Sequence, residues 1–124
     1  MAVDPRTDVP DKGILRALWI GVLVPPTAFL INLEVAYALV PRACGSRTVL
    51  LVHLVHLVTL ALAVYGGVVA LRTWRRSGAT WPGGGGGRIG RTQFMAGLGM
   101  LMGLMFVAVI VAQWIPSFIL DPCQ

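Results

Sequence analysis

Charged side chains are scarce in this sequence. Lys, Arg, Asp and Glu make up 12% of its 124 residues, whereas 56% are hydrophobic, and the mean hydropathy is +0.79. Soluble globular domains carry about 25% charged residues. The composition therefore excludes an ordinary soluble domain and predicts an integral membrane protein.

Residues that do chemistry are equally sparse. The chain has two cysteines, two histidines and five acidic side chains, and none of them belongs to a His-Glu-x-x-His zinc motif, a nucleophile elbow or a Cys-x-x-Cys pair. The glycine run at 83–87 lacks the preceding strand that a nucleotide-binding loop needs. The arginines flank apolar segments, as lipid-contacting residues do. We therefore expect no enzymatic activity, no catalytic or metal site, and neither nucleotide nor nucleic acid as a partner.

Three apolar segments dominate what is present. They run from Leu18 to Val40, from Val49 to Leu71 and from Phe94 to Leu120, and each reaches the ~20 residues that cross a ~30 Å hydrocarbon layer. We predict one all-α domain of three transmembrane helices, spanning 14–40, 49–72 and 93–120, with an N-terminal arm at 1–12 and a glycine-rich cytoplasmic loop at 73–92. Pro25 and Pro26 predict a kink in the first helix, because each proline removes an amide donor.

Arginine counts predict the orientation in a bacterial inner membrane. The connection between the second and third segments contains five arginines, Arg72, Arg75, Arg76, Arg88 and Arg91. The connection between the first and second segments contains two, Arg42 and Arg47. By the positive-inside rule, the second connection and the N-terminus are cytoplasmic and the C-terminus is periplasmic. Cys44 and Cys123 then lie on the same oxidising face. We predict a disulfide between them.

Four polar side chains fall at similar depths in the three segments. Glu34, His53, His56 and Gln113 each lie ~6 to 11 Å beneath the outer face at a rise of ~1.5 Å per residue. Because an ionisable group in hydrocarbon usually faces a bundle interior, we predict a buried polar layer in which a histidine pairs with Glu34. Asn32 is rotated by about 200° from Glu34 on the same helix. We therefore expect Asn32 to face a partner subunit.

Small residues predict where the helices approach one another. Gly67 continues the helical face that carries the two histidines. Gly99 and Gly103 form the Gly-x-x-x-Gly pattern that is associated with close helix contacts. These three glycines are the predicted helix-packing positions.

The histidines leave other chemistries open. A layer of Glu34 and histidine suits proton relay or hydrogen bonding to a quinone headgroup, and Cys44 with the histidines suits copper. His53 and His56 share one helical face and cannot both be axial ligands of one haem, although each could ligate a haem with another chain's help. We expect no cofactor bound by the chain alone, and contact with haem, quinone, pigment or copper within a complex stays open.

Two stretches at the outer ends of the helices carry a family resemblance. Tyr37 to Cys44 reads YALVPRAC, and Ala112 to Cys123 reads AQWIPSFILDPC. They resemble small three-helix membrane proteins from bacterial gene neighbourhoods of cytochrome c (haem-copper) oxidases, a family without an assigned activity. The resemblance implies a non-catalytic accessory or assembly subunit of a respiratory oxidase, whose partners are other membrane subunits and lipid. The alternatives are a proton-, quinone- or copper-handling protein that uses Glu34, His53 and His56, and a structural subunit of a photosynthetic membrane complex.

Overall fold

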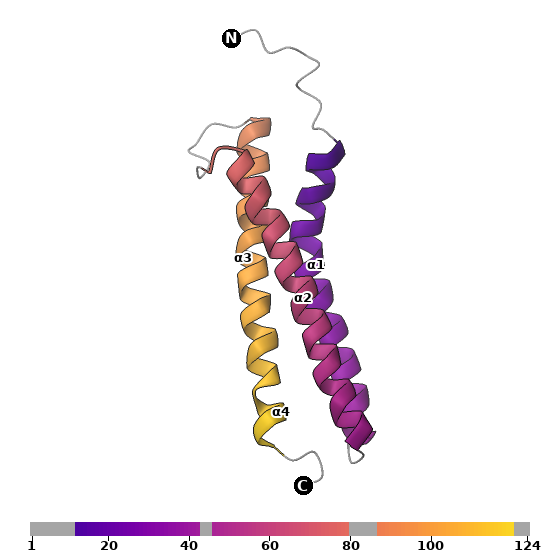
Figure 1. The fold of residues 1–124 in the computed structure, drawn as a ribbon. Helices are drawn as coiled ribbons and strands as arrows, with labels where there is room; N and C mark the ends of the chain where they lie inside the picture. Colours follow the sequence, from indigo (N-terminus) through magenta and orange to yellow (C-terminus); the bar gives the residue numbers. More distant parts are fainter. Residues whose placement is uncertain (1–11, 43–45, 80–86, 121–124) are drawn as a thin grey trace.

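Three long helices form the molecule in a computed structural model that describes residues 12–42, 46–79 and 87–120. They are α1 (Lys12–Leu39), α2 (Ser46–Arg76) and α3 (Arg88–Trp114). A short 3-10 turn, η1 (Val40–Arg42), extends α1, and a one-turn helix, α4 (Pro116–Ile119), follows α3. Helices α1 and α3 run in the same direction, and α2 runs in the opposite direction from the end of α1 to the start of α3 (Figure 1). The predicted all-α class is confirmed, and the described ranges contain no strand.

Each of the three helices is long and apolar enough to cross a membrane, over residues 12–42, 49–76 and 89–119. Large apolar side chains cover the outside of the bundle, such as Leu50 and Leu104, which are 69% and 70% exposed. The buried core is small and centres on Ala28, Ala63 and Ile110. This distribution is typical of a membrane protein, because lipid solvates the outer apolar side chains.

Helices α2 and α3 extend further than the apolar segments do. Helix α2 continues to residue 76 and α3 begins at residue 88, beyond the predicted limits of 72 and 93. The prediction used hydropathy, which marks the hydrocarbon layer, whereas a helix can continue into the headgroup region where long cationic side chains reach water. The connection between these helices is therefore shorter than predicted.

Adjacent glycines let α2 approach both of its neighbours. Gly66 lies against Pro25 of α1, where an added Cβ would be 2.8 Å from the proline Cδ. Gly67 lies against Gly103 of α3, where a Cβ on Gly103 would be 2.7 Å from the Gly67 Cα. Gly99 lies against the backbone of α1, where an added Cβ would be 3.1 Å from the carbonyl carbon of Gly21. The predicted packing glycines thus lie at helix crossings, where close approach allows backbones to pack.

Prolines act differently at the two places where they occur inside the spans. Helix α1 runs without interruption across Pro25 and Pro26, and the predicted kink there stays a prediction. In the third span α3 ends at Trp114 and α4 begins at Pro116, but Ile115 between them keeps α-helical dihedrals and its N–H donates to the carbonyl oxygen of Val111, so the span continues to residue 119. A proline has no N–H to donate and its ring clashes with the carbonyl four residues earlier. The sequence predicted a single helix through this point.

Candidate functional site

A polar network at the centre of the bundle joins all three helices. Asn32 of α1 is fully buried, with 0% of its surface exposed. Its Nδ2 donates a hydrogen bond to Oε1 of Gln113 on α3 at 3.1 Å, and its Oδ1 accepts one from Oγ1 of Thr59 on α2 at 3.1 Å. The expectation that Asn32 faces a partner subunit is therefore wrong, because its amide is satisfied inside the bundle.

Thr59 supplies one of the three side chains of this network, a role that the sequence did not predict. Its hydroxyl also lies 2.8 Å from the carbonyl oxygen of Val55, one turn earlier in α2, which is the usual position of a threonine hydroxyl in a helix. Thr59 follows His56 by three residues, so the spacing places it on the same inward face. An amide without partners in hydrocarbon costs several kcal/mol. The network therefore fixes the rotation of α1 relative to α2 and α3.

Glu34 lies on the opposite side of α1 from this network. Its side chain is exposed, and within 12–42, 46–79 and 87–120 it takes part in no hydrogen bond or ion pair. The predicted pairing of Glu34 with His53 or His56 is wrong for a simple geometric reason. Asn32 and Glu34 are two residues apart, so their side chains point in directions that differ by about 200° around the axis of α1. Because Asn32 points into the bundle, Glu34 points out of it. Of the predicted polar layer, His56 is buried, His53 and Gln113 are half-buried between the helices, and Glu34 is exposed.

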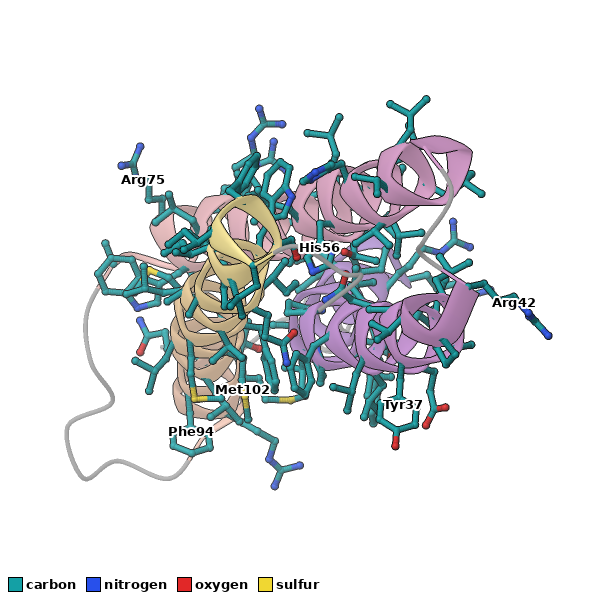
Figure 2. All side chains as sticks on the ribbon, turned by 90° about the horizontal axis from the view of Figure 1, so that it is seen from below. Tyr37, Arg42, His56, Arg75, Phe94 and Met102 are labelled. Carbon is teal, nitrogen blue, oxygen red and sulfur yellow. The ribbon has the colours of Figure 1, made fainter. Side chains whose placement is uncertain are left out.

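Exposed residues on α1 form a continuous line that we call the outward stripe. They repeat at alternating intervals of four and three residues and comprise Leu23, Thr27, Leu30, Glu34 and Tyr37. Tyr37 is 80% exposed and points away from the bundle (Figure 2). This spacing is that of a helix face which packs along a second helix. Within the described residues, no other helix of the bundle covers the outward stripe.

Two histidines and two aromatic rings form a cluster between α2 and the end of α3. The His56 ring stacks on Trp114 with a centroid distance of 6.0 Å and an interplanar angle of 15°. Trp114 Nε1 donates a hydrogen bond to Nδ1 of His53 at 2.8 Å, and the His53 ring lies 4.8 Å from that of Phe118. The predicted shared face of the two histidines is therefore directed at Trp114. Figure 2 shows His56 between the helices.

The hydrogen bonds give the two imidazoles opposite tautomers. Nδ1 of His53 accepts from Trp114, so in the neutral ring the proton resides on Nε2. Nδ1 of His56 lies 2.8 Å from the carbonyl oxygen of Val52, which can only accept, so Nδ1 is the donor there. A metal-ligating histidine normally donates its second ring N–H. His53 has the reverse arrangement, and His56, which has the suitable tautomer, is only 3% exposed.

Metal ligation has little support elsewhere in the described part of the chain. No group of three or more His, Cys, Asp or Glu residues comes together there. Cys44 and Cys123, the predicted disulfide, lie outside the described residues. Their neighbours are informative, because Val40 of η1 and Leu120, the residue after α4, line the same cavity. The segments that lead to the two cysteines therefore start from one place.

At the end of the bundle where α2 leads to α3, the described residues form a turn. Nε2 of Gln93 on α3 donates to the carbonyl oxygen of Ser77 at 2.8 Å, just after α2 ends. Gly78 adopts a φ of +105°, a left-handed conformation that favours glycine. Arg75 points away from the helices (Figure 2), and Arg72 and Arg76 are also exposed. This end can contact lipid headgroups through its cations.

No family model, curated protein or solved structure matches the chain. The site's own geometry therefore carries the functional argument. Inside the bundle, the Asn32 amide bonds to Thr59 and Gln113, and Nδ1 of His53 bonds to Trp114. Among the residues that the structure describes, Glu34 is the one that carries a carboxyl group, and its side chain is exposed.

Proposed function

We propose that the chain is a small non-catalytic accessory or assembly subunit of a bacterial membrane energy-converting complex, specifically a respiratory oxidase. It acts by binding another membrane subunit along the outward stripe of α1. The observation that carries this proposal is the exposure of Glu34 within a membrane-spanning helix. The choice of an oxidase is supported by the resemblance of residues 37–44 and 112–123 to the small proteins of oxidase gene neighbourhoods.

The depth of Glu34 makes its exposure costly. The spanning segment of α1 and η1 covers 31 residues, from Lys12 to Arg42. A hydrocarbon layer of ~30 Å takes ~20 of these at ~1.5 Å per residue. With the segment centred, Glu34 lies ~10 Å from the midplane and inside the layer. Ionisable side chains at such depth almost always face a protein interior or a cavity and find a partner.

The chemistry of the outward stripe indicates which partner fits. A second transmembrane helix would pack along Leu23 and Leu30, and a lysine, arginine or histidine at the level of Glu34 would pair with its carboxylate. Thr27 and Tyr37 add hydroxyl groups that can bond across the interface. A second copy of this chain does not fit as the partner, because it would place another Glu34 carboxylate, and no cation, opposite Glu34.

The alternative roles have weaker geometry. Proton relay between Glu34 and a histidine requires the two to be neighbours, whereas Glu34 lies on the face of α1 opposite to the buried network. Copper or haem ligation by His53 conflicts with its role as acceptor for Trp114. A structural subunit of a photosynthetic complex would use the same outward stripe, and the spectrum of the purified complex distinguishes it from an oxidase subunit.

Purification in mild detergent tests the proposal. We expect a tagged chain to copurify with oxidase subunits and haem absorbance, and oxidase turnover in membranes to fall when the chain is removed. A photoreactive benzoylphenylalanine in place of Leu30 should cross-link to an oxidase subunit, whereas the same residue in place of Leu104, on the outside of α3, should not. A colourless monomer, or a pigment spectrum without haem, would overturn the proposal.

We also propose that the N-terminus is cytoplasmic, the C-terminus periplasmic and Cys44 bonded to Cys123. Residues near both cysteines line one cavity, which supports the pairing. A membrane-impermeant maleimide applied to intact cells should label both thiols only after reduction, and reduction should raise the mass of the purified protein by two hydrogens. Two thiols that react before reduction would exclude the bridge, and labelling only in lysed cells would reverse the orientation.

A further inference from the structure

A cavity of about 250 Å³ opens at the end of the bundle where η1 and α4 lie. Its walls come from η1, α2 and α4 together with the residue after α4, and they are mainly apolar, with Val40, Val52, Pro116 and Leu120 among them. Two polar groups, His53 and Ser117, also line it. Small-molecule sites in proteins typically combine an apolar lining with a few placed polar groups.

His53 is held from behind by two aromatic rings. Trp114 occupies its Nδ1 with a hydrogen bond of 2.8 Å, and Phe118 packs at a centroid distance of 4.8 Å. Because Nδ1 is an acceptor, the ring carries its proton on Nε2. The two nitrogens of an imidazole point in widely separated directions, so this N–H points away from Trp114. Within the described residues Nε2 has no hydrogen-bond partner.

His53 lines the cavity and its Nδ1 is engaged by Trp114, so Nε2–H is the ring group that can donate to a ligand there. The described lining residues are otherwise apolar apart from Ser117. A metal ion would require a lone pair on Nε2, which the hydrogen bond from Trp114 opposes. The matching ligand group is a neutral acceptor such as a carbonyl oxygen, and the hydroxyl of Ser117 can donate a second bond.

We propose that this cavity binds the carbonyl-bearing headgroup of a membrane amphiphile, with Nε2–H of His53 donating to the carbonyl oxygen. The volume falls slightly below the ~300 Å³ at which sites for drug-sized ligands begin, so it accommodates one headgroup. The tail lies outside the cavity, against exposed apolar side chains nearby such as Leu50 and Ile119. Two sources supply this chemistry in a membrane: the ring of an isoprenoid quinone and the ester group of a phospholipid.

The site is formed by this chain alone, so it does not rest on the accessory role. It uses α2 and α4, whereas the proposed partner interface uses the outward stripe of α1. Loss of oxidase copurification would therefore leave the cavity intact. Loss of ligand binding by the purified chain would leave the interface intact.

Fluorescence of Trp114 tests the site in the purified full-length protein. The chain has four tryptophans, and replacing Trp19, Trp74 and Trp81 with Phe leaves Trp114 as the sole reporter. One titration uses a short-chain ubiquinone, which quenches indole fluorescence, and a second uses a phosphatidylcholine brominated near its ester groups. We expect one of the two to quench in a saturable manner, which also identifies the source of the carbonyl.

Two variants make the test specific. Val52→Phe fills the cavity with a side chain that does not interfere with tryptophan fluorescence. We expect it to abolish saturable quenching while His53 stays in place. His53→Phe keeps an aromatic ring but removes both the Nε2 donor and the acceptor of Trp114, so its binding is measured by ligand retention, which should weaken about tenfold, as expected for the loss of one hydrogen bond. Leu104→Phe on the outside of α3 is the matched control and should bind normally.

Thermal unfolding in the same detergent verifies that each variant is folded. Binding can also be measured without fluorescence, by retention of the radiolabelled quinone or lipid on the immobilised protein. Quenching or retention that is linear in ligand concentration, or that Val52→Phe and His53→Phe both leave unchanged, would overturn the proposal.

Discussion

Helix α1 has two faces with the same residue spacing and opposite surroundings. The face towards α2 and α3 carries mainly small residues and one amide, namely Leu18, Gly21, Pro25, Ala28 and Asn32. The outward stripe carries larger side chains and the only carboxylate of the helix, Glu34. Both faces repeat at intervals of three and four residues, so spacing alone does not tell them apart.

Side-chain size and hydrogen-bonding capacity distinguish the inside from the outside of this bundle. Leu30 is 57% exposed, whereas Asn32 is fully buried, which is the reverse of the order in a soluble protein. Lipid tails are as apolar as leucine, so burying Leu30 gains little, while small residues let backbones approach and amides bond across helices. The comparison predicts that equal changes on the two faces have unequal effects.

Substitution of a small inward residue should have the largest effect. Gly21 lies at a crossing where an added Cβ would be 2.9 Å from the Ala70 Cβ. We expect Gly21→Val to lower the free energy of unfolding by about 3 kcal/mol, because the helices must separate to admit the side chain. The free energy of unfolding is measured by titrating SDS into mixed micelles that contain the protein. Leu23→Val on the outward stripe is the control, and an equal loss there would contradict the distinction between the faces.

Removing the buried amide should have an intermediate effect. Asn32→Ala leaves Thr59 and Gln113 without their shared partner, and we expect a loss of about 1–2 kcal/mol. Combining it with Thr59→Val in a double-mutant cycle should give a coupling energy of about 0.6 to 1.7 kcal/mol. Leu33→Ala, the neighbouring exposed position, should change stability little. A coupling energy of zero would mean that the Asn32 to Thr59 bond does not stabilise the bundle.

Substitution of Glu34 should have the smallest effect on the isolated chain and a large one on assembly. We expect Glu34→Gln and Glu34→Leu to change the free energy of unfolding of the purified chain by less than about 0.5 kcal/mol, because Glu34 is exposed to detergent in both the folded and the unfolded chain. Copurification of the oxidase should fall strongly with Leu and less with Gln, which retains hydrogen bonding. Unchanged copurification with both variants would mean that the Glu34 carboxylate extends to the headgroups and binds no partner.

Much of the fold was predictable because each helix has to cross the same layer. The number of helices followed from segment length, and Gly67, Gly99 and Gly103 were found from their small size. The end of α3 at Trp114 was not predicted, although Pro116 has no N–H with which to continue the helical hydrogen bonds. Thr59 and Trp114 were not recognised as members of the site, because a threonine in a span and a tryptophan near its end each have a common structural explanation.

Sequence by itself determined that Asn32 and Glu34 point in opposite directions, because helical geometry fixes the angle between two positions of one helix. It did not determine which of the two faces inward, and the expectation was wrong for both. Tertiary structure decided this by placing Thr59 and Gln113 where they satisfy both ends of the Asn32 amide. The same holds for His53, whose tautomer depends on a hydrogen bond from Trp114, 61 residues away in the chain.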